Sequence, residues 1–212
     1  MKLVDLSHPI TESMPVYPGT EPPTLRTACT RAEHGFEERI LTLYSHTGTH
    51  LDAPCHILEH ADTLDHLGPD RFFGPATVLA CALGRGRAIE REHLASHEAR
   101  IRKADFVLLH TGWSKFWGSK AYYSDYPVLS PEAALWLAGF KLKGVGVDAI
   151  SVDAADTADY PVHRAILGSG AVVVENLTNL ALLADKKPLF SCLPLKIEQG
   201  DGSPVRAVAI YF

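Results

Sequence analysis

The sequence predicts an α/β protein built on a mixed sheet. Short apolar runs, several of them rich in β-branched residues, are typical of buried strands; they lie at 74–83, 105–110, 144–150 and 171–175. A helix start between two of these runs gives a strand–helix–strand order, which indicates at least one βαβ unit. No Pro/Gly/Ser-rich linker divides the 212 residues, so we expect residues 1–212 to form one domain around one core.

The amino-terminal part is expected to contain three strands and one irregular arm. Residues 2–7 alternate sufficiently for a strand, and the five prolines between positions 9 and 23 exclude regular structure there. That arm could cover a substrate or simply wrap the surface. Residues 24–30 and 37–45 are expected to be strands. We expect the second to be buried and to lead directly into the histidine-rich segment that follows it, because ligands at the end of a buried strand are held rigidly.

The middle of the chain predicts two helices, the second with a defined amino-terminal cap. Residues 90–101 suit a helix with an exposed basic face, so its histidines, His93 and His97, are not expected to bind metal. Ser130-Pro131-Glu132 combines an N-cap, a proline at the first helical position and an acid in the first turn. We expect that helix to reach about Lys141 and to be closed by Gly144.

The carboxy-terminal part is expected to contain two strands, at 188–197 and 204–212, joined by a turn at Asp201-Gly202. The aromatic segment 113–126 could line an aryl pocket or an oligomer interface, and its composition favours neither.

Composition excludes several classes of function. The net charge is −5 and no basic run accompanies it, which argues against nucleic acid as a partner. No apolar stretch is long enough to cross a membrane, and an acid at position 5 comes too early for a signal peptide, so a cytoplasmic location is expected. The four cysteines form no C-x-x-C pair, and there is neither a phosphate-binding glycine motif nor a G-x-S-x-G elbow.

The segment from His46 to His56, His-Thr-Gly-Thr-His-Leu-Asp-Ala-Pro-Cys-His, carries the candidate site. In an extended chain its ends would lie roughly 33 Å apart, too far for a single site. Gly48 and Pro54 allow the chain to fold back, so we expect a bent strand or loop that collects the side chains at one point. Imidazole and carboxylate ligands suit Zn, Mn or Fe, and one carboxylate can bridge two ions.

This motif resembles the signature of the cyclase family of metal-dependent hydrolases, whose members include bacterial kynurenine formamidase and isatin hydrolase. The resemblance extends over most of the chain, through the segments Val4–Ile10, Met14–Gly19, Leu109–Trp113, Gly146–Asp153 and Asp201–Ala207. It implies a compact α/β domain of the swivelling β/β/α kind that assembles as a homodimer or a higher homo-oligomer.

The resemblance also implies roles for individual residues. Two divalent ions are expected, with zinc as the first choice and manganese as the alternative. The implied ligands are His46, His50 and Asp52 for one ion, and Asp52, His163 and Glu175 for the other. His56 is expected to transfer protons, although it could instead be a fifth ligand. Tyr17 occupies a position where kynurenine formamidases commonly have a tryptophan that lines the substrate pocket; tyrosine could still stack on an aryl group, or serve only in packing.

The implied reaction is hydrolysis of a small aryl amide by a metal-activated hydroxide, with N-formylkynurenine as the leading substrate. Tyr17 in place of tryptophan favours a related activity of the same family, the hydrolysis of a cyclic amide such as isatin or of a lactone. Two alternatives come from other classes: a non-catalytic, metal-stabilised binding protein, and an iron-dependent redox enzyme that uses His46, His50 and Asp52 as an open triad.

Overall fold

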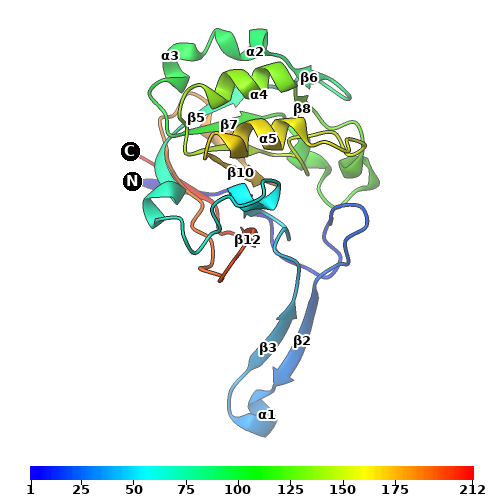
Figure 1. The fold of residues 1–212 in the computed structure, drawn as a ribbon. Coiled ribbons are helices and arrows are strands. Elements are labelled where there is room, and N and C mark those ends of the chain that lie inside the picture. Colours follow the sequence, from blue (N-terminus) through cyan, green and yellow to red (C-terminus); the bar gives the residue numbers. More distant parts are fainter.

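The structure, a computed structural model, describes residues 1–212 and is centred on a nine-stranded mixed sheet (Figure 1). The central strands β5, β7, β9 and β10 run parallel, and antiparallel strands flank them on both sides. In spatial order the sheet contains β1 (Lys2–Asp5), β13 (Val208–Tyr211), β11 (Leu189–Ser191), β5 (Phe73–Ala80), β7 (Phe106–His110), β9 (Gly144–Val147), β10 (Val172–Glu175), β4 (His50–Asp52) and β12 (Gly202–Pro204).

Three helix-containing crossovers join the four parallel strands, which agrees with the expectation of at least one βαβ unit. Helix α4 (Pro131–Ala138) connects β7 to β9, and helix α5 (Pro161–Gly168) connects β9 to β10. The predicted cap of α4 is present, since the Ser130 hydroxyl accepts a hydrogen bond from the Ala133 amide at 3.2 Å. The fold-class prediction of an α/β protein with a mixed sheet is therefore confirmed.

Both faces of the parallel strands are buried. On β7, Val107 and Leu109 belong to the core on the helix side, and Phe106 and Leu108 belong to the core on the opposite side. This double burial explains why these strands are continuous apolar runs. The aromatic segment 113–126 contributes Trp113, Tyr122 and Tyr126 to the helix-side core, so neither interpretation drawn from the sequence describes these three buried rings.

Two details of the predicted helices are wrong. The expected helix over 90–101 is two short helices, α2 (Arg91–Ala95) and α3 (Glu98–Ile101), separated at Ser96 and His97, which are weak helix formers. Helix α4 ends at Ala138, and Gly144 does not close it but begins β9. A Cβ atom at Gly144 would lie 2.8 Å from side-chain atoms of Phe106 and Val172, so the glycine is required by close packing in the sheet.

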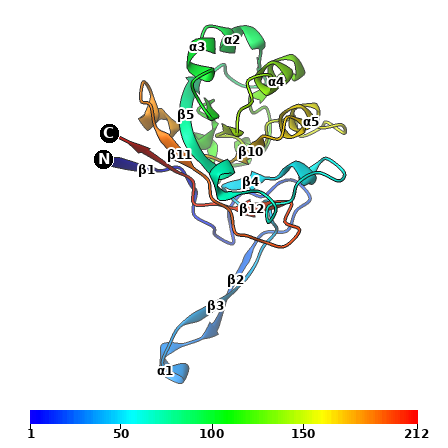
Figure 2. The same ribbon diagram turned by 60° about the vertical axis from the view of Figure 1, so that its left-hand side comes forward.

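Residues 8–23 contain no helix and no strand of the main sheet, which confirms the irregular arm. The two strands that follow it, β2 (Thr24–Cys29) and β3 (Glu38–Thr42), pair only with each other around the short helix α1 (Arg31–His34). Figure 2 shows this hairpin projecting away from the body. All five β3 residues are exposed, so the expectation of a buried strand is wrong: no second layer covers either face.

The carboxy-terminal turn also differs from the prediction. The chain turns at residues 198–199, and Gly202 lies in β12, opposite Asp52 of β4. A Cβ atom at Gly202 would lie 2.6 Å from the His46 ring, so this glycine permits a close approach instead of a turn.

The remaining elements are short. They are the pair β6 (Ala88–Ile89) and β8 (Val128–Leu129), and the 3₁₀ turns η1 (Pro54–His56), η2 (Pro69–Phe72), η3 (Trp113–Phe116), η4 (Lys120–Tyr123) and η5 (Leu180–Leu183). None of the helices combines the length and the apolar character that crossing a bilayer requires.

Candidate metal centre

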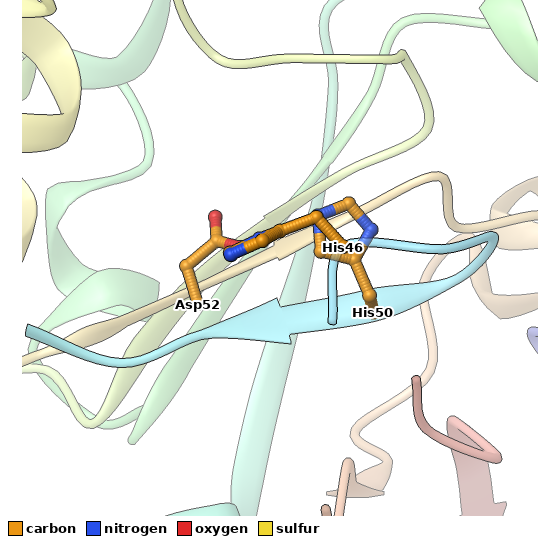
Figure 3. Close-up of side chains that lie close together, drawn as sticks. All are labelled: His46, His50 and Asp52. Carbon is orange, nitrogen blue, oxygen red and sulfur yellow. The ribbon is translucent and has the colours of Figure 1, made fainter. Parts of the chain in front are cut away.

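The histidine-rich segment folds back on itself as the sequence predicts. A turn at residues 45–46 is followed by Gly48 in the left-handed region at φ +66°, then by β4, and Pro54 begins the turn η1 that ends at His56. Figure 3 shows that the His46 and His50 rings and the Asp52 carboxylate converge. The bend brings into one place three side chains that an extended chain would separate.

Two other elements bring further ligand candidates to the same point. Strand β10 pairs antiparallel with β4, in a register that places Glu175 directly opposite His50. Helix α5 follows β9 and carries His163 in its first turn. Because the carboxyl ends of β9 and β10 meet at this edge of the sheet, residues far apart in the sequence become neighbours.

The five predicted ligands form two overlapping groups. The ligand atoms of His46, His50 and Asp52 all lie within 4.8 Å of one another, and so do those of Asp52, His163 and Glu175. In the first group Asp52 Oδ1 lies 2.7 Å from His46 Nδ1 and 3.2 Å from His50 Nε2. In the second group His163 Nε2 lies 3.3 Å from Glu175 Oε1 and 3.6 Å from Asp52 Oδ2. Asp52 is the residue that both groups share.

The second oxygen of Asp52 provides a physical test of whether a cation fits. Asp52 is 1% exposed, and its Oδ2 has no hydrogen-bond partner. A buried carboxylate oxygen without a partner is costly unless a cation neutralises it. His50, His163 and Glu175 are buried around it, so oxygen and imidazole ligands surround the unpaired atom. This donor set fits a divalent ion such as Zn or Mn.

Hydrogen bonds on the far side of the rings orient the imidazoles. Asp153 Oδ2 lies 2.7 Å from His163 Nδ1, and the Gly48 carbonyl oxygen lies 2.8 Å from His50 Nδ1. In both histidines the Nε2 atom is therefore turned toward the carboxylates. Such partners fix the tautomer and the direction of a metal-binding imidazole. Asp153 itself accepts hydrogen bonds from the backbone amides of Val162 and His163, so its own position is fixed.

A second set of bonds holds the bend at Gly48. The Tyr122 hydroxyl donates to Asn176 Oδ1 at 2.7 Å, and Asn176 Nδ2 donates to the Gly48 carbonyl at 2.9 Å. The Thr49 hydroxyl donates to the Asn176 carbonyl at 2.7 Å. A residue of the aromatic segment thus positions the ligand loop without lining the pocket.

His56 lies beside the two metal-ligand groups in a third cluster. Its ring centroid is 3.9 Å from that of His46, and its Nδ1 lies 3.6 Å from Asp201 Oδ2. Asp201 Oδ2 also lies 2.9 Å from His46 Nε2. The sequence predicts only a turn at Asp201, and nothing in it indicates that the Asp201 carboxylate lies beside His46 and His56. The pairing of β12 with β4 brings it there, and no local pattern in the sequence reveals that pairing.

Burial and charge act in opposite directions on these groups. Burial disfavours the charged form of His46, but the Asp52 and Asp201 carboxylates outweigh it and raise its pKa to about 10. Burial also opposes protonation of His163, but the surrounding carboxylates of Asp153, Asp52 and Glu175 raise its pKa well above the ordinary value. His56 is different, because burial dominates and lowers its pKa. Positive charge is therefore favoured where the ligands converge.

A cavity of about 270 Å³ opens onto this cluster. All five predicted ligands line it, and so do His56, Asn176, Tyr17, Ile57, Ile150 and Tyr160. Tyr17 therefore lies in the same cavity as the candidate ligands, and its contact with substrate stays a prediction. The cavity combines apolar and aromatic side chains with acids and imidazoles, which suits a small aryl ligand.

Histidines elsewhere in the chain do not join the site. His93, His97 and His110 are absent from the groups that could hold a metal ion. Cys55 lies within the histidine-rich segment, but its thiol donates to the Gly200 carbonyl at 3.6 Å and belongs to none of these groups. Asp153 is the second residue that the sequence reading did not assign. An acid that follows an apolar run and precedes the Pro-His of α5 is the signal that could have identified it.

Comparisons with known proteins identify the family of this chain. Residues 4–154 match the family described as "Putative cyclase". The chain is 33% identical to the kynurenine formamidase of Salinibacter ruber over 98% of this chain and 97% of that protein. Among solved structures it resembles isatin hydrolase A from Ralstonia solanacearum, with a TM-score of 0.86 and 26% identity over 98% of this chain and 91% of that one. It also resembles a predicted metal-dependent hydrolase from Bacillus stearothermophilus, with a TM-score of 0.77 and 27% identity over 98% and 97% of the two chains. The chain therefore belongs to the cyclase family, and its fold is that of the family.

Proposed function

We propose that this protein is a metal-dependent amidohydrolase that cleaves a small aryl amide, with N-formylkynurenine as the first substrate to test. The observation that carries the proposal is the pair of ligand groups that share the buried Asp52, beside a cavity with an aromatic wall. The full-length similarity to the Salinibacter ruber kynurenine formamidase supports the choice of substrate. The products would be kynurenine and formate.

The metal ions are assigned to the two groups around Asp52. His46, His50 and Asp52 would hold one divalent ion, and Asp52, His163 and Glu175 would hold a second, with zinc preferred to manganese. His46 would exchange its present carboxylate contact for an ion and lose a proton, because the ligand is the neutral imidazole. When bound, such ions lower the pKa of water and polarise a carbonyl oxygen.

The protein's own residues would orient the amide and supply the proton. Tyr17 and Ile57 would contact the aryl ring, and the carbonyl would then point toward the ligand groups that line the same cavity. His56 also lines this cavity, beside His46, where it would deliver a proton to the departing nitrogen. Asp201 Oδ2 faces His56 Nδ1, and a carboxylate there favours the orientation in which His56 Nε2 is directed into the cavity.

Hydrolysis of a cyclic amide is the second candidate. The 26% identity and TM-score of 0.86 with isatin hydrolase A from Ralstonia solanacearum favour it. The same ligand groups and the same proton carrier would serve, because ring opening also needs an attacked carbonyl and a protonated nitrogen. The two substrates differ in shape at the aromatic wall, so Tyr17 and Tyr160 would decide between them.

We also propose that the protein assembles as a homo-oligomer through the β2–β3 hairpin. A lone two-stranded hairpin is marginally stable in water, and this one exposes Phe36, Ile40 and Leu41. A second copy offers an apolar surface of its own, since Leu193, Leu195 and Ile197 are exposed on the segment between β11 and β12. A contact between the two would bury apolar side chains that are now in water.

The decisive experiment is turnover of N-formyl-L-kynurenine by protein loaded separately with zinc and with manganese. We expect metal-dependent formation of kynurenine that disappears after chelation and returns when metal is added back. The variant His56→Ala should lose about 10²–10⁴-fold in rate while it keeps its metal. Full metal occupancy without turnover of this substrate would overturn the formamidase proposal, and isatin would be the next substrate. Metal binding without turnover of either substrate would favour a non-catalytic binding protein.

A further inference from the structure

A second cavity lies far from the metal centre, at the opposite end of the sheet. Its volume is about 510 Å³. It is bounded by the first half of β5, the segment just before β7, helix α3 and the segment that leads into β11. These are the amino ends of the parallel strands, whereas the ligand groups lie at their carboxyl ends. Two strands of the sheet, β7 and β9, lie between β5 at this cavity and β10 at the ligand groups.

Four cations line this cavity: Arg100, Lys103, Lys186 and Lys187. We call it the basic groove. No acidic side chain lines it, and none of the four cations forms a salt bridge, although Arg102 and Lys143 nearby are both paired with acids. The protein as a whole carries a net charge of −5, so four cations without salt bridges at one place differ in sign from the rest of the protein. Like charges gathered at one place repel one another unless an anion joins them.

Two residues that line the groove, Thr77 and Arg100, offer hydrogen-bond donors to a ligand. Thr77 is 5% exposed, and its hydroxyl oxygen has no hydrogen-bond partner in the protein. A buried hydroxyl in this state is costly unless a ligand or water pairs with it. Arg100 is held in place by a hydrogen bond from its guanidinium to the Val78 carbonyl at 3.0 Å. That bond leaves other guanidinium N–H groups free to donate, since arginine carries five.

We propose that the basic groove binds a small anion that bears phosphate groups. Arginine, lysine and hydroxyl donors around one cavity match the acceptor oxygens of phosphate, and arginine adds bidentate geometry. The ligand is small because it has to fit a cavity of about 510 Å³, which cannot hold a nucleic acid duplex. The acidic remainder of the surface also repels an extended polyanion.

The test uses the metal-loaded protein and isothermal titration calorimetry, with inorganic phosphate and with fructose 1,6-bisphosphate as probes at constant ionic strength in sodium chloride. We expect the bisphosphate to bind more tightly than phosphate, because it can contact more of the four cations. Thr77→Val keeps the shape of the side chain and removes only the hydroxyl. Loss of one hydrogen bond to a charged ligand should weaken binding about 10-fold to 100-fold. The double variant Lys103→Gln/Lys187→Gln should weaken it further.

Lys120→Gln is the matched control, because Lys120 is an exposed lysine of η4 outside the groove. It should bind both probes as the wild type does. Equal affinity in the wild type and both groove variants would overturn the proposal, and would assign any binding to the metal centre or to general charge. Tighter binding of citrate than of the bisphosphate would overturn the phosphate class. Binding of a DNA duplex that depends on the same lysines would replace the small ligand by a nucleic acid.

Discussion

The segment around β4 and the β2–β3 hairpin are neighbours in the sequence but are stabilised in different ways. Strand β4 lies between β10 and β12, its three residues are buried, and the loop before it is fixed by Asn176. The hairpin pairs only with itself and exposes every residue of β3. The chain thus forms a preorganised cluster of candidate ligands directly after a hairpin that the body does not support. A cluster of ligands needs contacts on several sides to fix its geometry, whereas the hairpin leaves its strands available for contact with a partner.

The largest effect is expected from Asp52→Asn, which removes the charge that both ligand groups share. The substitution keeps the size of the side chain, so the fold should persist, while neither ion is held correctly. Replacing a partner of a ligand typically costs about 10–100-fold, and loss of a shared ligand should exceed that. Bound metal can be measured by elemental analysis and turnover in parallel. A variant that kept full metal content and full activity would contradict the assignment.

A smaller effect is expected from Asp153→Asn, which changes the partner of His163 without touching a ligand atom. The 2.7 Å contact to His163 Nδ1 would remain, but the tautomer and basicity of the ring would no longer be fixed. We expect metal affinity or activity to fall about 10–100-fold with little change in fold. Titration with a competing chelator measures the affinity. His93→Gln, at an exposed histidine outside the site, should change nothing.

A third effect is expected on the hairpin, where the double substitution Ile40→Glu/Leu41→Glu tests whether the exposed strand binds a second copy. These side chains are 44% and 59% exposed, so their replacement should alter the stability of the body by no more than about 0.5 kcal/mol. The oligomer should dissociate, because charges would enter its apolar contact. Light scattering after size-exclusion chromatography reports the mass. An unchanged mass would exclude these residues from the interface, and a monomeric wild type would exclude the oligomer itself.

The smallest effect concerns pH and His8, whose ring stacks on Trp117 at 3.9 Å and whose Nε2 is buried without a partner. Burial lowers the pKa of His8 from 6.5 to about 4. Between these values the unfolded chain binds more protons than the folded one, so this residue makes stability fall as pH drops from 6.5 to 4. In His8→Phe this contribution should vanish, so the free energy of unfolding should decrease less steeply as the pH drops. Urea unfolding at several pH values measures this free energy. An identical pH dependence in the two proteins would contradict the expectation.

Much of the ligand centre could be predicted from the sequence because its signals are local. Three candidate ligands and the candidate proton carrier lie within eleven residues, and Gly48 and Pro54 mark the bends that bring them together. The βαβ units could be predicted for a similar reason, since apolar runs and the Ser130 cap are read from consecutive residues. His163 and Glu175 were assigned from family resemblance, because no local spacing connects them to His46.

Only the tertiary structure decided the rest, because it depends on which strands become neighbours. Asp201 approaches His46 and His56 because β12 pairs with β4, and Gly202 is required there to make room for the His46 ring. The exposure of β3 likewise depends on the absence of a layer beside it, which its apolar residues Ile40 and Leu41 do not indicate. The sequence by itself therefore determined the kind of chemistry and the ligands close together in the chain. Strand order and packing determined their partners, because those contacts join segments that no local pattern connects.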